Sequence, residues 1–213
     1  MKVYAAKEAY YTLQGEGAQT GRAAVFFRFS GCNLWTGREK DRHKATCQFC
    51  DTDFVGINGE GGGKFKAAAA VADHIEEIWS THATGGTPYV ICTGGEPLLQ
   101  LDPPLIEELH QRGFEVGVET NGTIAAPAGL DWICVSPKAN ATMLQTSGNE
   151  IKLVYPQPLA MPDRFEEMEF ENFFLQPMDG PDSAQNVEAT ADYCMKNPKW
   201  RLSLQTHKLI GLP

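Results

Sequence analysis

The stretch Tyr89-Val90-Ile91-Cys92-Thr93-Gly94-Gly95-Glu96-Pro97 carries the pattern from which the fold class follows. Its first four residues are aromatic, β-branched or apolar, which predicts a strand that is buried on both faces. Polar and glycine residues follow that strand at once. A buried strand that runs directly into a polar turn is typical of α/β proteins, whose sites lie at the carboxyl ends of parallel strands.

The same pattern recurs along the chain. Four further apolar runs are each followed directly by polar residues: Glu119-Thr120-Asn121-Gly122, Ser136-Pro137-Lys138, Gln176-Pro177-Met178-Asp179 and Gln205-Thr206-His207-Lys208. The carboxyl ends of parallel strands converge on one face of a sheet, so these groups are expected to form one composite site.

Helical patterns separate some of the apolar runs. They are expected over residues 71–79, over 102–113 with Asp102 as the N-cap, and from Asp182 or Ser183 to a point before Pro198 with Val187 turned inward. Alternating strands and helices favour a parallel sheet with helices outside, and these helices are too few for an eight-fold barrel. The prediction is an α/β fold, a partial, open TIM-like barrel in a single domain over residues 1–213. The stretch 56–63 is expected to be a flexible loop.

Charge and hydropathy narrow the class of protein. The chain has 18 basic and 27 acidic residues, a net charge of −9, which argues against a nucleic-acid partner. No apolar run approaches the roughly 20 residues of a membrane span, and the first residues lack the apolar core of a signal peptide. We therefore expect no membrane association and a cytoplasmic location.

Three cysteines occupy one short stretch: Cys32, then fourteen residues, then Cys47-Gln48-Phe49-Cys50. Three interpretations are open. A structural zinc site could take His43 from the spacer as its fourth ligand. A redox pair could form at Cys47 and Cys50. A four-iron cluster with three protein ligands would leave one iron exposed.

At these residues the sequence resembles a known superfamily. An aromatic residue between the last two cysteines, here Phe49, is typical of radical S-adenosylmethionine enzymes, and so is the run Gly94-Gly95-Glu96-Pro97. The usual first spacing there is three residues, whereas here it is fourteen. The enlarged spacer and the polar turns quoted above resemble 7-carboxy-7-deazaguanine synthase, some members of which have an enlarged cysteine loop. This resemblance covers nearly the whole chain and implies an abbreviated radical S-adenosylmethionine core.

The resemblance also implies a reaction. Such a lyase contracts the ring of 6-carboxy-5,6,7,8-tetrahydropterin by radical chemistry to give 7-carboxy-7-deazaguanine with release of ammonia, in queuosine and 7-deazapurine biosynthesis. The implied cofactors are a [4Fe–4S] cluster, S-adenosylmethionine and Mg²⁺. Two alternatives remain: another radical enzyme such as a glycyl-radical activase, or a structural zinc module.

Residue by residue, the resemblance assigns the cluster to Cys32, Cys47 and Cys50, and Mg²⁺ to Thr52. Its S-adenosylmethionine contacts are Phe49, Gly94, Gly95, Glu96, Ser136, Pro137, Lys138, Gln176, Pro177, Met178 and Asp179. The last group comprises the substrate contacts implied by the resemblance and the strand-end residues that the topology places beside them. They are Leu13, Gln14, Gly15, Arg28, Thr93, Glu119, Asn121, His207 and Pro213.

Some of these residues also have simpler interpretations. Arg28, a charge at the end of an apolar strand, would otherwise form a salt bridge with an Asp or Glu. No conventional catalytic acid or base is implied, although His207 could move protons near neutral pH.

Two segments are expected to complete the site. The cluster-binding loop spans 31–54, and the apolar tail 205–213 should fold inward and bring Pro213 to the pterin. A flavodoxin or ferredoxin is the expected reductant, and a homodimer is expected from the family. The charged spacer 33–46 could dock that reductant, but a solvated helix is the favoured interpretation.

Overall fold

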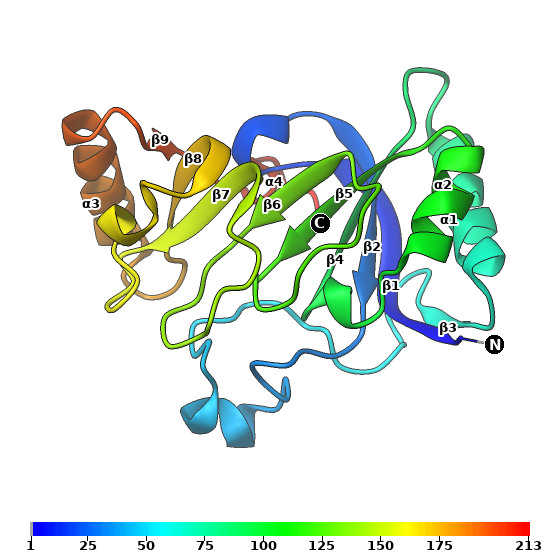
Figure 1. Ribbon diagram of the computed structural model, residues 1–213, viewed down its shortest axis with the longest axis horizontal. Coiled ribbons are helices and arrows are strands. Elements are labelled where there is room, and N and C mark those ends of the chain that lie inside the picture. The colour runs from blue at the N-terminus through cyan, green and yellow to red at the C-terminus, as the bar shows by residue number, and fades with distance from the viewer. Residues whose placement is uncertain (1) are drawn as a thin grey trace.

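The computed structural model describes residues 2–213, and a mixed sheet forms its centre (Figure 1). The sheet has nine strands in the order β3-β1-β2-β4-β5-β6-β7-β8-β9. Their bounds are β1 Tyr4–Leu13, β2 Ala23–Phe29, β3 Gly63–Phe65, β4 Tyr89–Gly94, β5 Glu115–Thr120, β6 Trp132–Val135, β7 Ser147–Tyr155, β8 Glu169–Pro177 and β9 Arg201–Leu202.

Four α-helices and four short 3₁₀ helices accompany the sheet. The α-helices are α1 Ala68–His82, α2 Pro103–Gln111, α3 Ser183–Lys196 and α4 Thr206–Ile210. The 3₁₀ helices are η1 Gly17–Gln19, η2 Glu39–Lys44, η3 Pro97–Leu99 and η4 Pro162–Phe165. Figure 1 shows α1 and α2 beside the β1–β5 part of the sheet and α3 at the opposite end, beside β8 and β9.

The strands β2, β4, β5, β6, β7, β8 and β9 pair in parallel in that order, as the strand-to-polar pattern predicts. The sheet is open, because β3 and β9 lie at opposite edges. The expectation of an α/β fold with an unclosed sheet is therefore confirmed. β1 differs from the expectation, since it pairs antiparallel with both β2 and β3. β3 starts at Gly63, so the stretch expected to be a flexible loop ends in a strand.

The helices form where the apolar spacing predicts them. α1 buries Val71, Ala72 and Ile75 against the sheet. α2 begins after Asp102, whose carboxylate accepts a hydrogen bond from the backbone N–H of Leu105 at 3.2 Å. α3 contradicts one expectation: Val187 is 40 % exposed, and Thr190 is the buried residue of that helix. Since Thr190 donates to the Asn186 carbonyl, its hydroxyl is satisfied inside the helix.

This architecture gathers the loops that follow the parallel strands at one rim of the sheet. The cysteine loop follows β2, and its middle, coloured light blue in Figure 1, projects beyond the sheet. Among residues 2–213, no helix combines the length and the apolar character that crossing a bilayer requires.

Candidate active site

A cavity of about 410 Å³ lies at the carboxyl ends of the parallel strands. Strands β2, β4, β5, β7 and β8 and the loop after β6 each place a polar side chain in its wall: Arg28, Thr93, Glu119, Lys152, Gln176 and Ser136. The cysteine loop and the last residues of the chain complete the lining. One composite site thus forms where the sequence pattern predicts it.

Most of the residues assigned from the sequence line this cavity. They are Cys32, Cys47, Phe49, Cys50, Thr52, Gly94, Gly95, Ser136, Lys138, Gln176, Pro177, Asp179, Leu13, Gln14, Arg28, Thr93, Glu119, Asn121, His207 and Pro213. Four assigned residues are not part of the lining: Gly15, Glu96, Pro137 and Met178. The ligand assigned to each residue stays a prediction.

The three cysteine thiols are held differently. The sulfur of Cys32 accepts the backbone N–H of Leu34 at 3.4 Å, and burial raises its pKa. Cys47 and Cys50 share a hydrogen bond, which raises the pKa of Cys47 and lowers that of Cys50 to about 6. The ammonium of Lys138 favours the thiolate form of both. A negatively charged group bound to these sulfurs would therefore lie near the ammonium of Lys138.

The donor set of the loop fits a multi-iron group better than a single zinc ion. Among the described residues, no three His, Cys, Asp or Glu side chains form a ready site for one metal ion, and His43 does not line the cavity that the three cysteines line. The sulfurs that bind a cluster are attached to different irons and stand further apart. The buried indole N–H of Trp35 has no acceptor, and Trp35 packs in the same small cluster of side chains as Cys32 and Cys50.

The turn Gly94-Gly95 lies directly against the cysteine loop. A Cβ on Gly95 would lie 2.3 Å from the Gly31 carbonyl oxygen and 2.6 Å from the Cys32 Cβ. Gly94 has φ +141°, and a Cβ there would meet the Phe29 carbonyl at 2.3 Å. The glycines therefore allow β4 to end against Cys32, a requirement of the protein itself that is independent of any ligand.

Glu96 is fully buried and already satisfied. Its carboxylate accepts hydrogen bonds from the Thr120 hydroxyl at 2.8 Å, the Asn121 N–H at 2.8 Å and the Leu98 N–H at 3.0 Å. Burial raises its pKa. Glu96 thus joins the end of β4 to the end of β5, behind the cavity wall.

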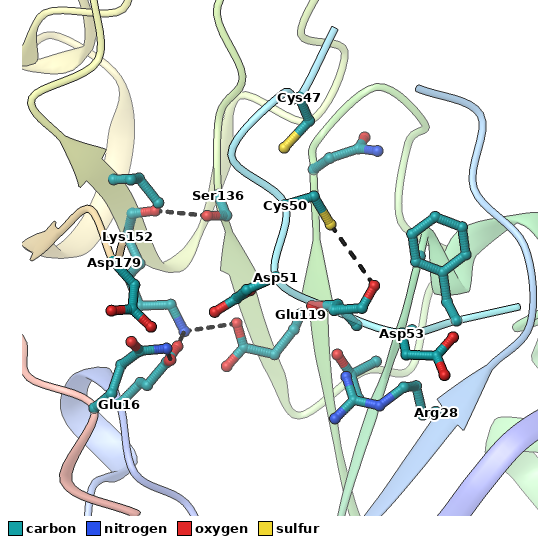
Figure 2. Close-up of a pocket in the computed structure, with 18 of the residues that line it drawn as sticks. Glu16, Arg28, Cys47, Cys50, Asp51, Asp53, Glu119, Ser136, Lys152 and Asp179 are labelled. Carbon is teal, nitrogen blue, oxygen red and sulfur yellow. Dashed lines mark hydrogen bonds and ion pairs between the residues drawn. The ribbon is translucent and has the colours of Figure 1, made fainter. Parts of the chain in front are cut away.

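An ion-pair network crosses the floor of the cavity (Figure 2). The ammonium of Lys152, whose side chain is 3 % exposed, lies 2.7 Å from Glu16 and 2.8 Å from Glu119. Glu119 also accepts from the Gln14 amide at 3.0 Å. Burial raises the pKa of Glu16, but Lys152 and the amides of Gln205 and Gln176 outweigh it and lower that pKa to about 2. Two carboxylates therefore share one cation.

Arg28 occupies another part of the cavity wall. Its guanidinium donates to Glu8 at 2.7 Å and to the Tyr10 hydroxyl at 3.0 Å, while Tyr10 stacks on Phe26 with ring centroids 5.9 Å apart. The salt bridge considered as the simpler interpretation is therefore present, and Arg28 still faces the cavity. A flat aromatic wall with a cation beside it suits a planar, anionic molecule.

The C-terminal segment reaches the cavity through α4. His207 packs against Gly15, where a Cβ would overlap its imidazole, and burial lowers the pKa of His207. Leu209 and Ile210 are 74 % and 61 % exposed, so the expectation that the apolar tail folds inward is wrong for these two side chains. Gly211, at φ 70°, turns the chain, and the Pro213 carbonyl accepts from the Thr12 hydroxyl at 3.3 Å.

Several lining residues were not predicted from the sequence. Lys152 and Glu16 are the most important, because they form the ion-pair network. Lys152 interrupts the apolar run Ile151–Val154, and a lone charge in a buried strand is the signal that singled out Arg28. The same signal could have identified Lys152. Other lining residues lie in segments expected at the site but were assigned no role there: Leu34, Trp35, Asp51, Asp53 and Phe54 of the cysteine loop, and Thr120, Gln205 and Lys208 of the polar turns. The further unpredicted residues are Glu8, Tyr10, Phe26 and Val154.

Comparison with known proteins identifies the relatives of this chain, although a scan of family models finds no match. The chain is 62 % identical to 7-carboxy-7-deazaguanine synthase of Caulobacter vibrioides over 212 residues, which cover 99 % of each chain. It is 60 % identical to the synthase of Bradyrhizobium diazoefficiens, covering 98 % of this chain and 99 % of that one.

The fold also has a solved counterpart. The crystal structure of QueE from Escherichia coli matches with a TM-score of 0.61 and 22 % identity, covering 95 % of this chain and 94 % of that one. The predicted family, and with it an enzyme rather than a zinc module, is confirmed by the curated relatives. The chain belongs to the 7-carboxy-7-deazaguanine synthase family.

Proposed function

We propose that this protein is a radical S-adenosylmethionine lyase that contracts the ring of 6-carboxy-5,6,7,8-tetrahydropterin to 7-carboxy-7-deazaguanine with release of ammonia, in queuosine and 7-deazapurine biosynthesis. One observation carries the proposal. A single cavity is lined both by the three cysteines and by the charged groups Arg28, Glu119 and Lys152. A radical source and a polar, bifunctional substrate can therefore occupy the same space.

The cysteine side of the cavity is proposed to hold the cofactors. Cys32, Cys47 and Cys50 would hold a [4Fe–4S] cluster, and Lys138, Ser136, Gln176 and Asp179 would bind S-adenosylmethionine. When bound, the cluster and S-adenosylmethionine supply one-electron chemistry that generates a carbon radical. The protein contributes the position of both groups and the exclusion of water. Lys138, near Cys47 and Cys50, favours an anionic group at this end.

The remaining walls suit the two ends of the pterin. Its amidine-like edge donates hydrogen bonds, and Glu119 has lone pairs beyond those that Gln14 and Lys152 occupy. Its carboxylate needs donors, which Arg28 and the neutral imidazole of His207 can provide. The Tyr10–Phe26 wall would lie along the flat ring.

The remaining features of the proposal concern the whole protein. The open sheet is proposed to be an abbreviated TIM-like barrel in one domain, with loop 31–54 and tail 205–213 closing the site. Thr52 lines the cavity and would provide an oxygen for Mg²⁺, which retains several waters and needs no cage of carboxylates. A flavodoxin or ferredoxin as reductant, a homodimer and a cytoplasmic location stay predictions.

Anaerobic turnover tests the proposal directly. Reconstituted protein receives a reductant, S-adenosylmethionine and the carboxytetrahydropterin, and products are followed by mass spectrometry. The expected product is 7-carboxy-7-deazaguanine, lost in Cys47→Ala. Formation of deoxyadenosine without the deazaguanine would support the proposed cofactor chemistry but reject the proposed substrate. A content of one zinc and no iron per chain would reject both the cofactor chemistry and the substrate. Identical turnover in chelator and in Mg²⁺ would reject the magnesium site.

A further inference from the structure

The spacer between the first two cysteines folds back on itself. The backbone N–H of Thr46 donates to the Leu34 carbonyl at 3.2 Å, which brings the two ends of the spacer together. Trp35 and Ala45 are buried with Phe54 inside the loop so formed. The ends of this compact loop meet, and apolar side chains pack against it. Its charged centre forms the short helix η2, Glu39–Lys44, which buries no residue, in agreement with the solvated helix favoured from the sequence.

Arg42 connects this spacer to the Cys47–Cys50 turn. Its Nη1 donates to the Gln48 carbonyl at 2.7 Å and to the Cys50 carbonyl at 3.0 Å. Two carbonyl groups of one short turn are therefore held by a single nitrogen. The turn's own backbone contact, from Cys50 N–H to the Cys47 carbonyl, is long at 3.4 Å, so Arg42 supplies the shorter contacts.

The guanidinium is itself held from two sides. It lies over the indole of Trp35, 4.2 Å from the ring centroid, and Trp35 packs edge-to-face on Phe54. Its Nε donates to Glu39 at 2.7 Å, and its Nη2 contacts the other oxygen of that carboxylate. A planar guanidinium that stacks on an indole and pairs bidentately has a fixed orientation, which a lysine ammonium could not adopt.

The other basic residues of the spacer lack this arrangement. Arg38, Lys40, His43 and Lys44 are exposed. The Arg42 side chain, in contrast, is only 31 % exposed, although its partner Glu39 is 74 % exposed. The spacer therefore presents several charges to solvent and turns one inward, toward the carbonyls of the cysteine turn.

We propose that Arg42 is a positioning residue for the cluster: it holds the Cys47–Cys50 turn in the conformation that receives iron. In its ion pair with the exposed Glu39, it also turns the guanidinium, rather than the carboxylate, toward the bound group. The inference rests on the proposed function, because it presupposes a cluster at the three cysteines. Reduction adds a negative charge to such a cluster, and a nearby cation favours the reduced state. The enlarged spacer thus supplies a residue that contacts the backbone of the metal-binding cysteine turn rather than the metal itself.

Three variants separate the two parts of this role. Arg42→Gln removes the charge and shortens the side chain, whereas Arg42→Lys keeps the charge but loses the planar guanidinium. Lys40→Gln, the control, removes an exposed charge from the same helix. After anaerobic reconstitution, iron per chain, iron release to a chelator and the reduction potential of the cluster are measured. Circular dichroism of the iron-free proteins checks that they fold.

We expect both Arg42 variants to release iron about 10-fold faster than the wild type. The potential should shift to more negative values in Arg42→Gln and stay close to the wild-type value in Arg42→Lys. Lys40→Gln should match the wild type in both measurements. Wild-type iron release from both Arg42 variants would overturn the positioning role, and an unchanged potential in Arg42→Gln would overturn the electrostatic one. If Arg42→Gln does not fold, Arg42→Lys alone decides the positioning role. Wild-type protein that binds no iron would overturn the proposed function instead.

Discussion

At the scale of single residues, Lys152 governs the charge balance of the cavity. It is nearly fully buried and pairs with both Glu16 and Glu119. A buried charge without its partner is strongly destabilising, whereas a satisfied network is tolerated. Its two partners come from segments far apart in the sequence, after β1 and at the end of β5. A single side chain on β7 therefore joins three parts of the site.

Lys152→Met should destabilise the fold by about 3–5 kcal/mol, because it leaves two carboxylates without their cation. The free energy of unfolding is measured by denaturant titration. Lys40→Met, an exposed lysine, serves as the matched control and should change stability by less than about 0.5 kcal/mol. Glu16→Gln combined with Lys152→Met should cost less than the sum of the two single changes. Additive losses would show that Glu16 and Lys152 are not coupled.

Glu16 gives the protein a specific response to acid. The pKa of Glu16 is lowered to about 2 in the folded protein from its ordinary value of 4.5, which holds in the unfolded chain. Between pH 2 and 4.5 the unfolded chain therefore binds more protons than the folded one. The stabilisation is present above about pH 4.5 and is lost as the pH falls toward 2. Wild-type protein should therefore lose roughly 3 kcal/mol more than Glu16→Gln across this window. Parallel losses in the two proteins would contradict the assignment.

At the scale of elements, the β4 turn and the cysteine loop pack so closely that there is no room for a side chain between them. Gly95→Ala places a methyl group on the Gly31 carbonyl and the Cys32 Cβ. We expect a loss of about 1–3 kcal/mol in stability and reduced iron binding, since Cys32 must move. Gly85→Ala, with nothing within 4 Å, is the control. Iron binding equal to that of the wild type in Gly95→Ala would show that Cys32 tolerates the shift.

The elements that the sequence predicts well are those whose apolar residues are continuous or regularly spaced. β2, β4 and α2 are of this kind, and the polar residues that follow the strands reach one cavity as expected. β1 was missed because Lys7 and Glu8 interrupt it, although Lys7 is buried and pairs with Asp53 of the cysteine loop. Such a partner lies far away in the sequence, and single-sequence patterns cannot identify it.

The same limit explains the missed parts of the site. The pairing of Lys152 with Glu16 depends on how β7 and the β1–β2 connection meet, which no local pattern encodes. The contact of Arg42 with the cysteine turn depends on the closure of the spacer at Leu34 and Thr46. Conversely, the prediction that the apolar tail folds inward is wrong for Leu209 and Ile210. Hydropathy alone does not determine which side chains of a short helix face the protein.

At the scale of the whole molecule, the cavity is closed by segments from distant parts of the chain. Lys208 of α4 lies 3.2 Å from Asp51 of the cysteine loop and 2.6 Å from Asp179, which follows β8. These three side chains are each about half exposed, so each pair contributes at most about 1 kcal/mol. They act mainly to align α4 across the opening, and the chain then turns back at Gly211 to place Pro213 in the wall.

The position of Pro213 leads to a test of the whole arrangement. In a chain that ends at Pro213, a carboxylate lies in the cavity wall beside Thr12, where it can accept from the donor edge of the pterin. Adding a Gly-Ser-Gly-Ser tail after Pro213 removes this charge and obstructs the wall. A charge-assisted hydrogen bond contributes about 1.5–3 kcal/mol, so substrate affinity should fall by roughly 10- to 100-fold in a calorimetric titration. The same tail at the opposite end of the chain should leave affinity unchanged, because Tyr4 at the start of β1 contacts Asp102 beside α2 and neither residue lines the cavity. Equal affinity in all three proteins would mean that α4 and the tail close the cavity without contacting the substrate.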